Sequence, residues 1–136
     1  MPTEIRPELS KKNKYWIPKH RYYELKHFVM QYPDWDLYIA TTRSYAKACK
    51  HEGRVTEISD PVYRTVEKRL IYTQNKDLCK KVANNTDPLL GREILAAIIL
   101  EESYEKVKAR HDIPCCKDVW YDLYHKFFWL LDAARK

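Results

Sequence analysis

Glycine is nearly absent from this sequence of 136 residues, which contains only Gly53 and Gly91. Tight β-hairpins, phosphate-binding loops and dinucleotide fingerprints each need several glycines, because they require positive φ angles or a close approach of the backbone to a ligand. The shortage argues against β-rich folds and nucleotide-dependent enzymes. Hydrolase, zinc-protease and Walker motifs are also missing, and the five histidines lack evident triad partners, so we expect a protein that is not an enzyme.

Long apolar runs are missing as well. No stretch approaches the ~20 apolar residues that span a bilayer, and no charged start leads into an apolar secretory core. We therefore expect a soluble cytoplasmic protein that has no membrane partner. The four cysteines, Cys49, Cys79, Cys115 and Cys116, are then most simply reduced thiols.

The adjacent cysteines Cys115 and Cys116 lie close to His111 and raise the question of a metal site or a redox pair. Structural zinc sites usually draw on cysteines spaced two to four residues apart, and adjacent cysteines rarely reach one tetrahedral ion. A Cys-x-x-Cys redox pattern is missing. We expect one thiol beneath a turn and the other at a helix start, with no metal and no cofactor.

Positive charge is concentrated toward the N-terminus. The chain carries a net charge of +6, and residues 10–27 alone carry +5, with six basic residues against one acidic residue. This excess favours an anionic partner, although a solvated basic surface explains it equally well. Residues 1–14 show no periodicity and predict an arm, whose candidate phosphate contacts are Lys11, Lys12 and Lys14.

Apolar residues recur at helical spacing through most of the chain, and no long alternation with period two predicts a strand. We expect an all-α fold of five or six helices, with a helix over about 18–31 and a second that starts at Asp34. Asp60-Pro61 and Asp87-Pro88 each predict a further helix start, because aspartate caps free N–H groups and proline lacks an N–H.

The stretch 41–59 is the least regular part of the chain and is interpreted as a linker. It suggests two parts, a basic arm with the N-terminal helices over residues 1–56 and a helical domain over residues 57–136. The long helix that begins at Asp60 is expected to turn one apolar face toward a core, made of Val62, Val66, Leu70, Leu78, Cys79, Val82 and Ala83.

The last fifty residues combine a short helix, a turn and a long terminal helix. Ser103 is a competent N-cap, residues 112–114 end the short helix, and residues 116–135 contain neither proline nor glycine. With the apolar stretch 89–100 as a supporting helix, this pattern predicts a C-terminal helix-turn-helix over about 88–134. Its expected core residues are Val107, Ile113, Trp120, Tyr124, Phe127 and Leu131.

The face of the terminal helix opposite this core is the candidate surface for contacting base edges in the major groove. Aspartates on that face repel phosphate, although a carboxylate can accept a hydrogen bond from the amino group of cytosine. The candidate base contacts are Lys117, Asp118, Tyr121, Asp122, His125 and Lys126. The candidate phosphate contacts are Ser103, Lys106, Lys108 and Arg110, together with the lysines of the arm.

Three features of the sequence resemble a known family: the segment SYEKVKARHDIPCCKDVWYDLYHKFFWLL (103–131), the segment KYWIPKHRYYELKHFVMQYPDW (14–35) upstream, and the Asp60-Pro61 start between them. The family consists of small phage regulators of Gram-positive hosts, the RinA/ArpU type. Members of that family resemble region 4 of sigma factors at their C-terminal ends and are associated with activating late phage genes. The resemblance implies a sequence-specific DNA-binding transcriptional regulator in the bacterial host cytoplasm. Host RNA polymerase is a candidate further partner, which the apolar end of the last helix could contact.

Carried onto this sequence, the resemblance places the turn at residues 113–115 and the recognition-helix start at Lys117, Asp118, Tyr121 and Asp122. The sequence departs from the family pattern in three places. Glu102 stands where a glycine is common, Cys116 stands where a small polar residue or glycine is usual, and residues 123–125 replace positions that are often arginine-rich. The last departure removes positive charge from the helix.

Two other functions remain open on the sequence. One is a protein-interaction module that binds host RNA polymerase or another host protein, and the other is a DNA-packaging protein like a small terminase subunit. Residues 103–136 carry a net charge of only +2, so DNA binding is expected to need the N-terminal arm or a second subunit in a homodimer. Residues 127–131 are apolar on every side, which predicts cover by the N-terminal helices, a dimer seam or a partner.

Overall fold

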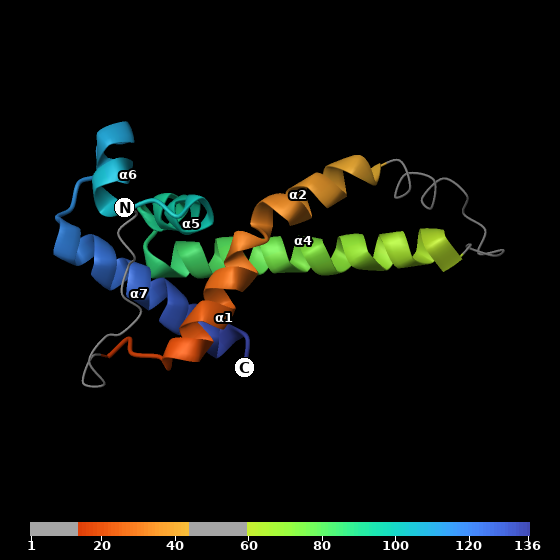
Figure 1. The fold of residues 1–136 in the computed structure, drawn as a ribbon, viewed down its shortest axis with the longest axis horizontal. Coiled ribbons are helices and arrows are strands. Elements are labelled where there is room, and N and C mark those ends of the chain that lie inside the picture. The colour runs from red at the N-terminus through yellow and green to blue at the C-terminus, as the bar shows by residue number, and fades with distance from the viewer. Residues whose placement is uncertain (1–13, 44–59) are drawn as a thin grey trace. The chain divides into compact units, whose positions relative to one another are not determined.

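The computed structural model describes residues 14–43 and 60–136, and this part of the chain is all-α, as predicted. Its helices are α1 (Lys19–Met30), α2 (Tyr32–Thr41), α4 (Asp60–Thr86), α5 (Gly91–Leu100), α6 (Tyr104–Arg110) and α7 (Lys117–Ala134) (Figure 1). The chain divides into two compact units. Unit 1 comprises Met1–Gln31 and Cys79–Lys136, and unit 2 comprises Tyr32–Leu78.

The helix boundaries follow the proline and aspartate signals with two differences. α2 begins at Tyr32, before the expected Asp34, because Pro33 falls in its first turn, where a missing N–H costs nothing. α5 begins after Asp87-Pro88 and not at it. The Asp87 carboxylate accepts hydrogen bonds from the N–H groups of Leu89 (2.7 Å) and Leu90 (3.0 Å), and so caps a turn that leads into α5.

The predicted boundary between residues 56 and 57 lies outside the described residues, as does most of the predicted linker. Within the described residues, α1 belongs to the same compact unit as α5, α6 and α7. The predicted division instead groups the helix over 18–31 with the N-terminal part of the chain. The difference arises because the apolar face of α1 packs on helices that are distant in the sequence.

The core of unit 1 is built around α1, which contacts both α5 and α7 (Figure 1). Its rings are packed edge to face or tilted, as for Tyr22 with Phe128 at 4.8 Å between ring centroids. The hydroxyl groups of Tyr22 and Tyr124 lie 3.4 Å apart and share a hydrogen bond, so both polar ends are satisfied inside the core. The ring centroids of Trp129 and Tyr15 lie 5.5 Å apart. The segment before α1 thus covers part of the apolar end of α7.

Gly91 sets the approach of α5 to the end of α4. A Cβ atom at Gly91 would overlap the backbone carbonyl of Ala83, so a larger residue needs a shift of the backbone. Cys79, Val82 and Ala83 are buried there, as predicted for the α4 face, and burial raises the pKa of the Cys79 thiol to about 12.

Arg21 links the start of α1 to the end of α7 through hydrogen bonds and an ion pair. Its Nε donates to Asp132 (2.7 Å), its Nη1 donates to Glu24 (2.9 Å), and its Nη2 donates to the carbonyl of Arg135 (3.4 Å). The guanidinium of Arg135 in turn stacks on the ring of Phe28 at 3.5 Å. These contacts hold the two helices in one register along their shared aromatic face.

Unit 2 pairs α2 with the first part of α4. Trp35 is buried and its ring lies near that of Tyr72, while Arg69 donates to the carbonyl of Ile39 and to Thr42 Oγ1 at the end of α2. The prediction that Leu70 points toward a core is wrong, because its side chain is 58% exposed. Leu70 lies about 100° around the helix from Arg69, which occupies the face toward α2.

Candidate nucleic-acid interface

The chain turns from α5 into α6 through a left-handed residue. Glu101 has a φ of 53°, and the N–H of Glu102 donates to the carbonyl of Ala97 at 2.9 Å, which closes the end of α5. The position that favours glycine is therefore Glu101, one residue before the one that the family resemblance indicates. Glu101 also lies 3.7 Å from Lys26 of α1, and this ion pair links the bend to the core helix.

Tyr104 anchors α6 to both the turn and α7. Its hydroxyl donates to the carbonyl of Cys115 (2.7 Å), and its backbone N–H donates to the hydroxyl of Tyr121 (3.2 Å). Ser103 caps α6 as predicted, because its Oγ accepts a hydrogen bond from the N–H of Lys106. The Ser103 hydroxyl, a candidate phosphate contact, is thus already engaged in the helix cap.

The turn before α7 has the construction that the sequence indicates. Ile113 is buried beneath it, Cys115 is half-buried, and Cys116 is exposed at the N-cap of α7. Burial raises the pKa of the Cys115 thiol. No group of three His, Cys, Asp or Glu side chains in the described residues is arranged to hold a metal ion. Cys116 thus lies at the helix start, as expected of one thiol, and the other thiol, Cys115, is half-buried in the turn.

The inward face of the segment is as predicted. Trp120 is fully buried, and its indole Nε1 has no hydrogen-bond partner among the described residues. The ring of Tyr104 lies 6.2 Å from that of Trp120, and α6 therefore packs on α7 through an aromatic contact. All six expected core residues are buried, namely Val107, Ile113, Trp120, Tyr124, Phe127 and Leu131.

The outward face of α7 is narrower than expected. Lys117, Asp118 and Asp122 are exposed, whereas Tyr121 and Lys126 are half-buried. Tyr121 also uses its hydroxyl oxygen to accept the N–H of Tyr104. The exposed half of α7 near its N-terminus therefore presents one lysine, two aspartates and the apolar Val119 to solvent.

The prediction that His125 lies on this exposed face is wrong, because its side chain is only 8% exposed. His125 is about 60° around the helix from Phe128, and α1 covers Phe128 through Tyr22. The buried face thus extends far enough to include His125. Burial lowers the pKa of this imidazole, an effect that the nearby Asp122 carboxylate partly opposes.

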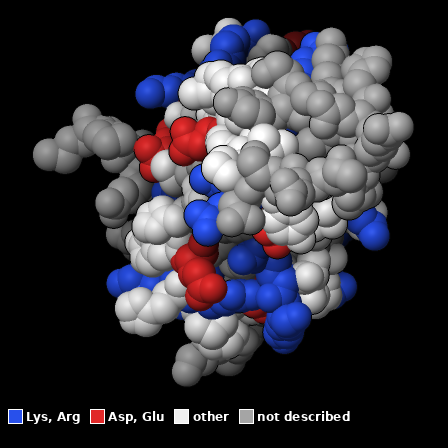
Figure 2. Space-filling view, turned by 90° about the vertical axis from the view of Figure 1, so that its right-hand side faces the viewer, with Lys and Arg blue, Asp and Glu red and all other residues white. Residues whose placement is uncertain are grey.

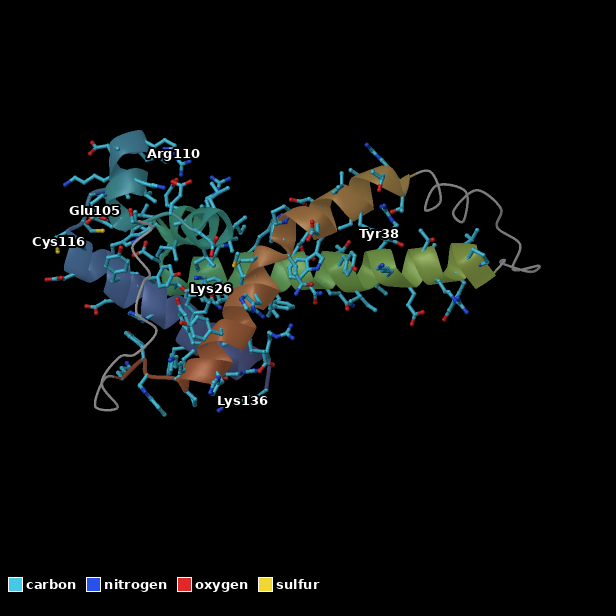
Figure 3. The ribbon with its side chains drawn as sticks, in the orientation of Figure 1. Lys26, Tyr38, Glu105, Arg110, Cys116 and Lys136 are labelled. Carbon is cyan, nitrogen blue, oxygen red and sulfur yellow. The ribbon has the colours of Figure 1, made fainter. Side chains whose placement is uncertain are left out.

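Two of the exposed basic side chains near the turn are paired with carboxylates. Lys117 Nζ lies 2.9 Å from Glu105 Oε1, and Arg110 Nη2 lies 2.7 Å from Glu102 Oε2. Figure 3 shows Glu105 on α6 and Cys116 at the start of α7 close together at one end of this unit, with Arg110 at the other end of α6. Lys117 and Glu105 each hold the other in its charged form, so the pKa of Lys117 is raised and that of Glu105 is lowered.

The remaining phosphate candidates are not gathered into one uniform patch. Lys106 and Lys108 are exposed on α6, and Lys108 Nζ lies 5.7 Å from the ring of Tyr104. Lys14 is exposed beside Tyr15, whereas Lys11 and Lys12 lie outside the described residues. On a different side of the molecule, the right-hand side of Figure 1, Figure 2 shows lysine and arginine side chains beside aspartate and glutamate side chains.

The role of the glutamates was not predicted from the sequence. Glu102 and Glu105 pair with Arg110 and Lys117, and Glu93 of α5 lies 3.8 Å from His111 in the turn. Glu105 and Lys117 are twelve positions apart, so no helical spacing signals their contact. Their proximity depends on the direction that the turn gives to α7.

Comparison of the chain with family models, with curated proteins and with solved structures finds no match. Among the residues that the structure describes, no helix is long and apolar enough to cross a membrane. The function is therefore inferred from the geometry of α5, α6 and α7 and from the sequence pattern.

Proposed function

We propose that this chain is a sequence-specific DNA-binding transcriptional regulator that uses α6, the turn and α7 as a helix-turn-helix. The observation that carries the proposal is the packing of α6 on α7 through Tyr104 and Trp120, which leaves the first turns of α7 exposed at the end of the unit. A helix held by its inner face, with the outer face of its N-terminal half open to solvent, suits entry into a major groove.

In this proposal the exposed side chains of α7 contact bases while α6 contacts the backbone. Asp118 and Asp122 can accept hydrogen bonds from cytosine amino groups, and Lys117 can donate to guanine or to phosphate. Lys106 and Lys108 are exposed on α6, and no carboxylate among the described residues forms an ion pair with either. They are the side chains best placed to hold phosphates.

The resemblance to RinA/ArpU-type phage regulators extends the proposal. It indicates a phage-derived activator of late genes that acts with host RNA polymerase in the bacterial cytoplasm. The half-buried Cys115 and the buried Ile113 occupy the turn positions that the resemblance assigns to them. In this proposal the exposed aspartates of α7 give the chain a base preference different from that of members of the resembled family with an arginine-rich helix.

The test is DNA binding measured as fluorescence anisotropy over a range of salt concentrations. Wild-type protein should bind duplex DNA with an affinity that falls steeply between about 50 and 200 mM salt. Lys106→Ala with Lys108→Ala should reduce the slope of log K against log salt by about 0.9 for each phosphate that the variant no longer neutralises. The matched control is Lys80→Ala with Lys81→Ala, which removes two exposed lysines from α4. Binding that does not respond to salt would rule out the proposal.

A second candidate function is binding to a protein partner, and the surface of unit 2 favours it. Leu37, Tyr63, Leu70 and Ile71 are all exposed there, and exposed apolar side chains can contact a protein partner. Co-purification of host RNA polymerase without retention of DNA would support an interaction module. A ring-sized mass in solution would instead support a packaging protein like a small terminase subunit.

A further inference from the structure

The two ion pairs beside the turn differ in how open they are to solvent. The Glu102 side chain of the Arg110 pair is only 13% exposed, so that carboxylate is part of the packed surface. The Glu105 and Lys117 side chains are 60% and 57% exposed, and both project at the end of the unit where α7 begins. The open pair can exchange partners with little rearrangement, because water and salt already screen it.

The two partners of the open pair differ in the length of their side chains. Glu105 lies in the first turn of α6 and has a short side chain, and the pKa of its carboxyl is lowered first by the hydrogen bond with Lys117 and then by its own backbone N–H. Lys117 is the first residue of α7 and carries a flexible side chain. When an anion approaches, the lysine is therefore the partner that moves.

We propose that Glu105 competes within the molecule with DNA phosphate for Lys117. This inference rests on the proposed function. In the free protein the Glu105 carboxylate occupies Lys117 at 2.9 Å, and in the complex a phosphate oxygen replaces it. The ion pair thus lowers affinity for every DNA sequence equally, since phosphate contacts carry no base information.

The experiment measures the binding of a short labelled mixed-sequence duplex by the full chain and by three variants. Glu105→Gln keeps the shape of the side chain and removes its charge. Glu67→Gln removes the same charge from an exposed position in unit 2 and controls for net charge. The double variant Glu105→Gln with Lys117→Gln tests whether the effect passes through Lys117. Thermal melting of each variant checks that the fold is retained.

Glu105→Gln should raise the affinity for the duplex on the order of fivefold at about 0.1 M salt, because no ion pair has to be broken before Lys117 meets a phosphate. The gain should shrink at higher salt, which screens the ion pair of the free wild-type protein. Glu67→Gln should leave the affinity at wild-type strength, and the double variant should lose the gain. A gain that persists without Lys117, or a Glu105→Gln affinity equal to that of wild type, overturns the inference. Wild-type protein that binds no duplex, or binds it without salt dependence, overturns the proposed function itself.

Discussion

In unit 1, large aromatic side chains from α1 and α7 are fully buried, whereas among the described residues of unit 2 Trp35 alone is buried. Unit 2 is held instead by polar and cation–π contacts between two helices, such as Lys68 Nζ at 4.8 Å from the ring of Tyr38. Two helices share one narrow interface, so apolar residues on their other faces stay in solvent. We infer that the stability of the described residues lies mainly in unit 1.

The largest expected difference comes from truncating one leucine in each unit. Leu25 of α1 is 0% exposed, and Leu25→Ala should lower the free energy of unfolding by about 2–5 kcal/mol through reduced burial and a new cavity. Leu70→Ala removes the same atoms from an exposed position in unit 2 and should change the free energy of unfolding by less than about 0.5 kcal/mol. Urea unfolding of both variants measures this. Equal losses of stability would show that the two units do not differ as described.

A smaller effect is expected from adding a single methyl group to unit 1. Gly91→Ala places a Cβ against the carbonyl of Ala83 and should destabilise the protein by about 1–3 kcal/mol, because the backbone of α4 must shift. Ala40→Leu adds more atoms at an exposed position of α2 and serves as the control. If the Gly91→Ala variant melted at the same temperature as wild type, α5 would not approach α4 as closely as described.

The smallest effect concerns pH. The pKa of His125 is lowered by burial, so the unfolded chain takes up a proton there before the folded chain does as the pH falls below about 6.5. Unit 1 should therefore lose stability between pH 7 and pH 5. His125→Gln should make this decline shallower, as measured by thermal melting at several pH values. If stability declined as steeply with falling pH in the variant as in wild type, titratable groups other than His125 would cause the decline.

The helical spacing of apolar residues predicted which side chains of unit 1 are buried where a single face of one helix packs on the core. The bounds of α1 and α7 and the inward position of Trp120 follow from apolar spacing and the nearby prolines. The burial of His125 does not, because the width of the buried face depends on how α1 packs on Phe128. Leu70 has the same helical spacing as the buried residues of α4, yet it lies in the part of that helix that belongs to unit 2, where its face is not covered.

In the candidate site, too, the features set by local sequence were predicted and those set by the packing of helices were not. The turn and the six inward residues were correct, since they depend on local spacing and on the N-cap at Ser103. The pairing of Lys117 with Glu105 was not, because it depends on the angle between α6 and α7. Charge counting along the sequence therefore overestimated the number of basic side chains available to phosphate.

Hydrogen exchange of the full chain, with and without duplex DNA, tests the central claim most directly because it compares the two units in one measurement. We predict slower exchange on DNA binding over residues 103–122, where α6, the turn and the first turns of α7 lie, and unchanged exchange in α2. Protection confined to unit 2, or none at a DNA concentration that saturates binding, would contradict the assignment of DNA binding to the C-terminal helices.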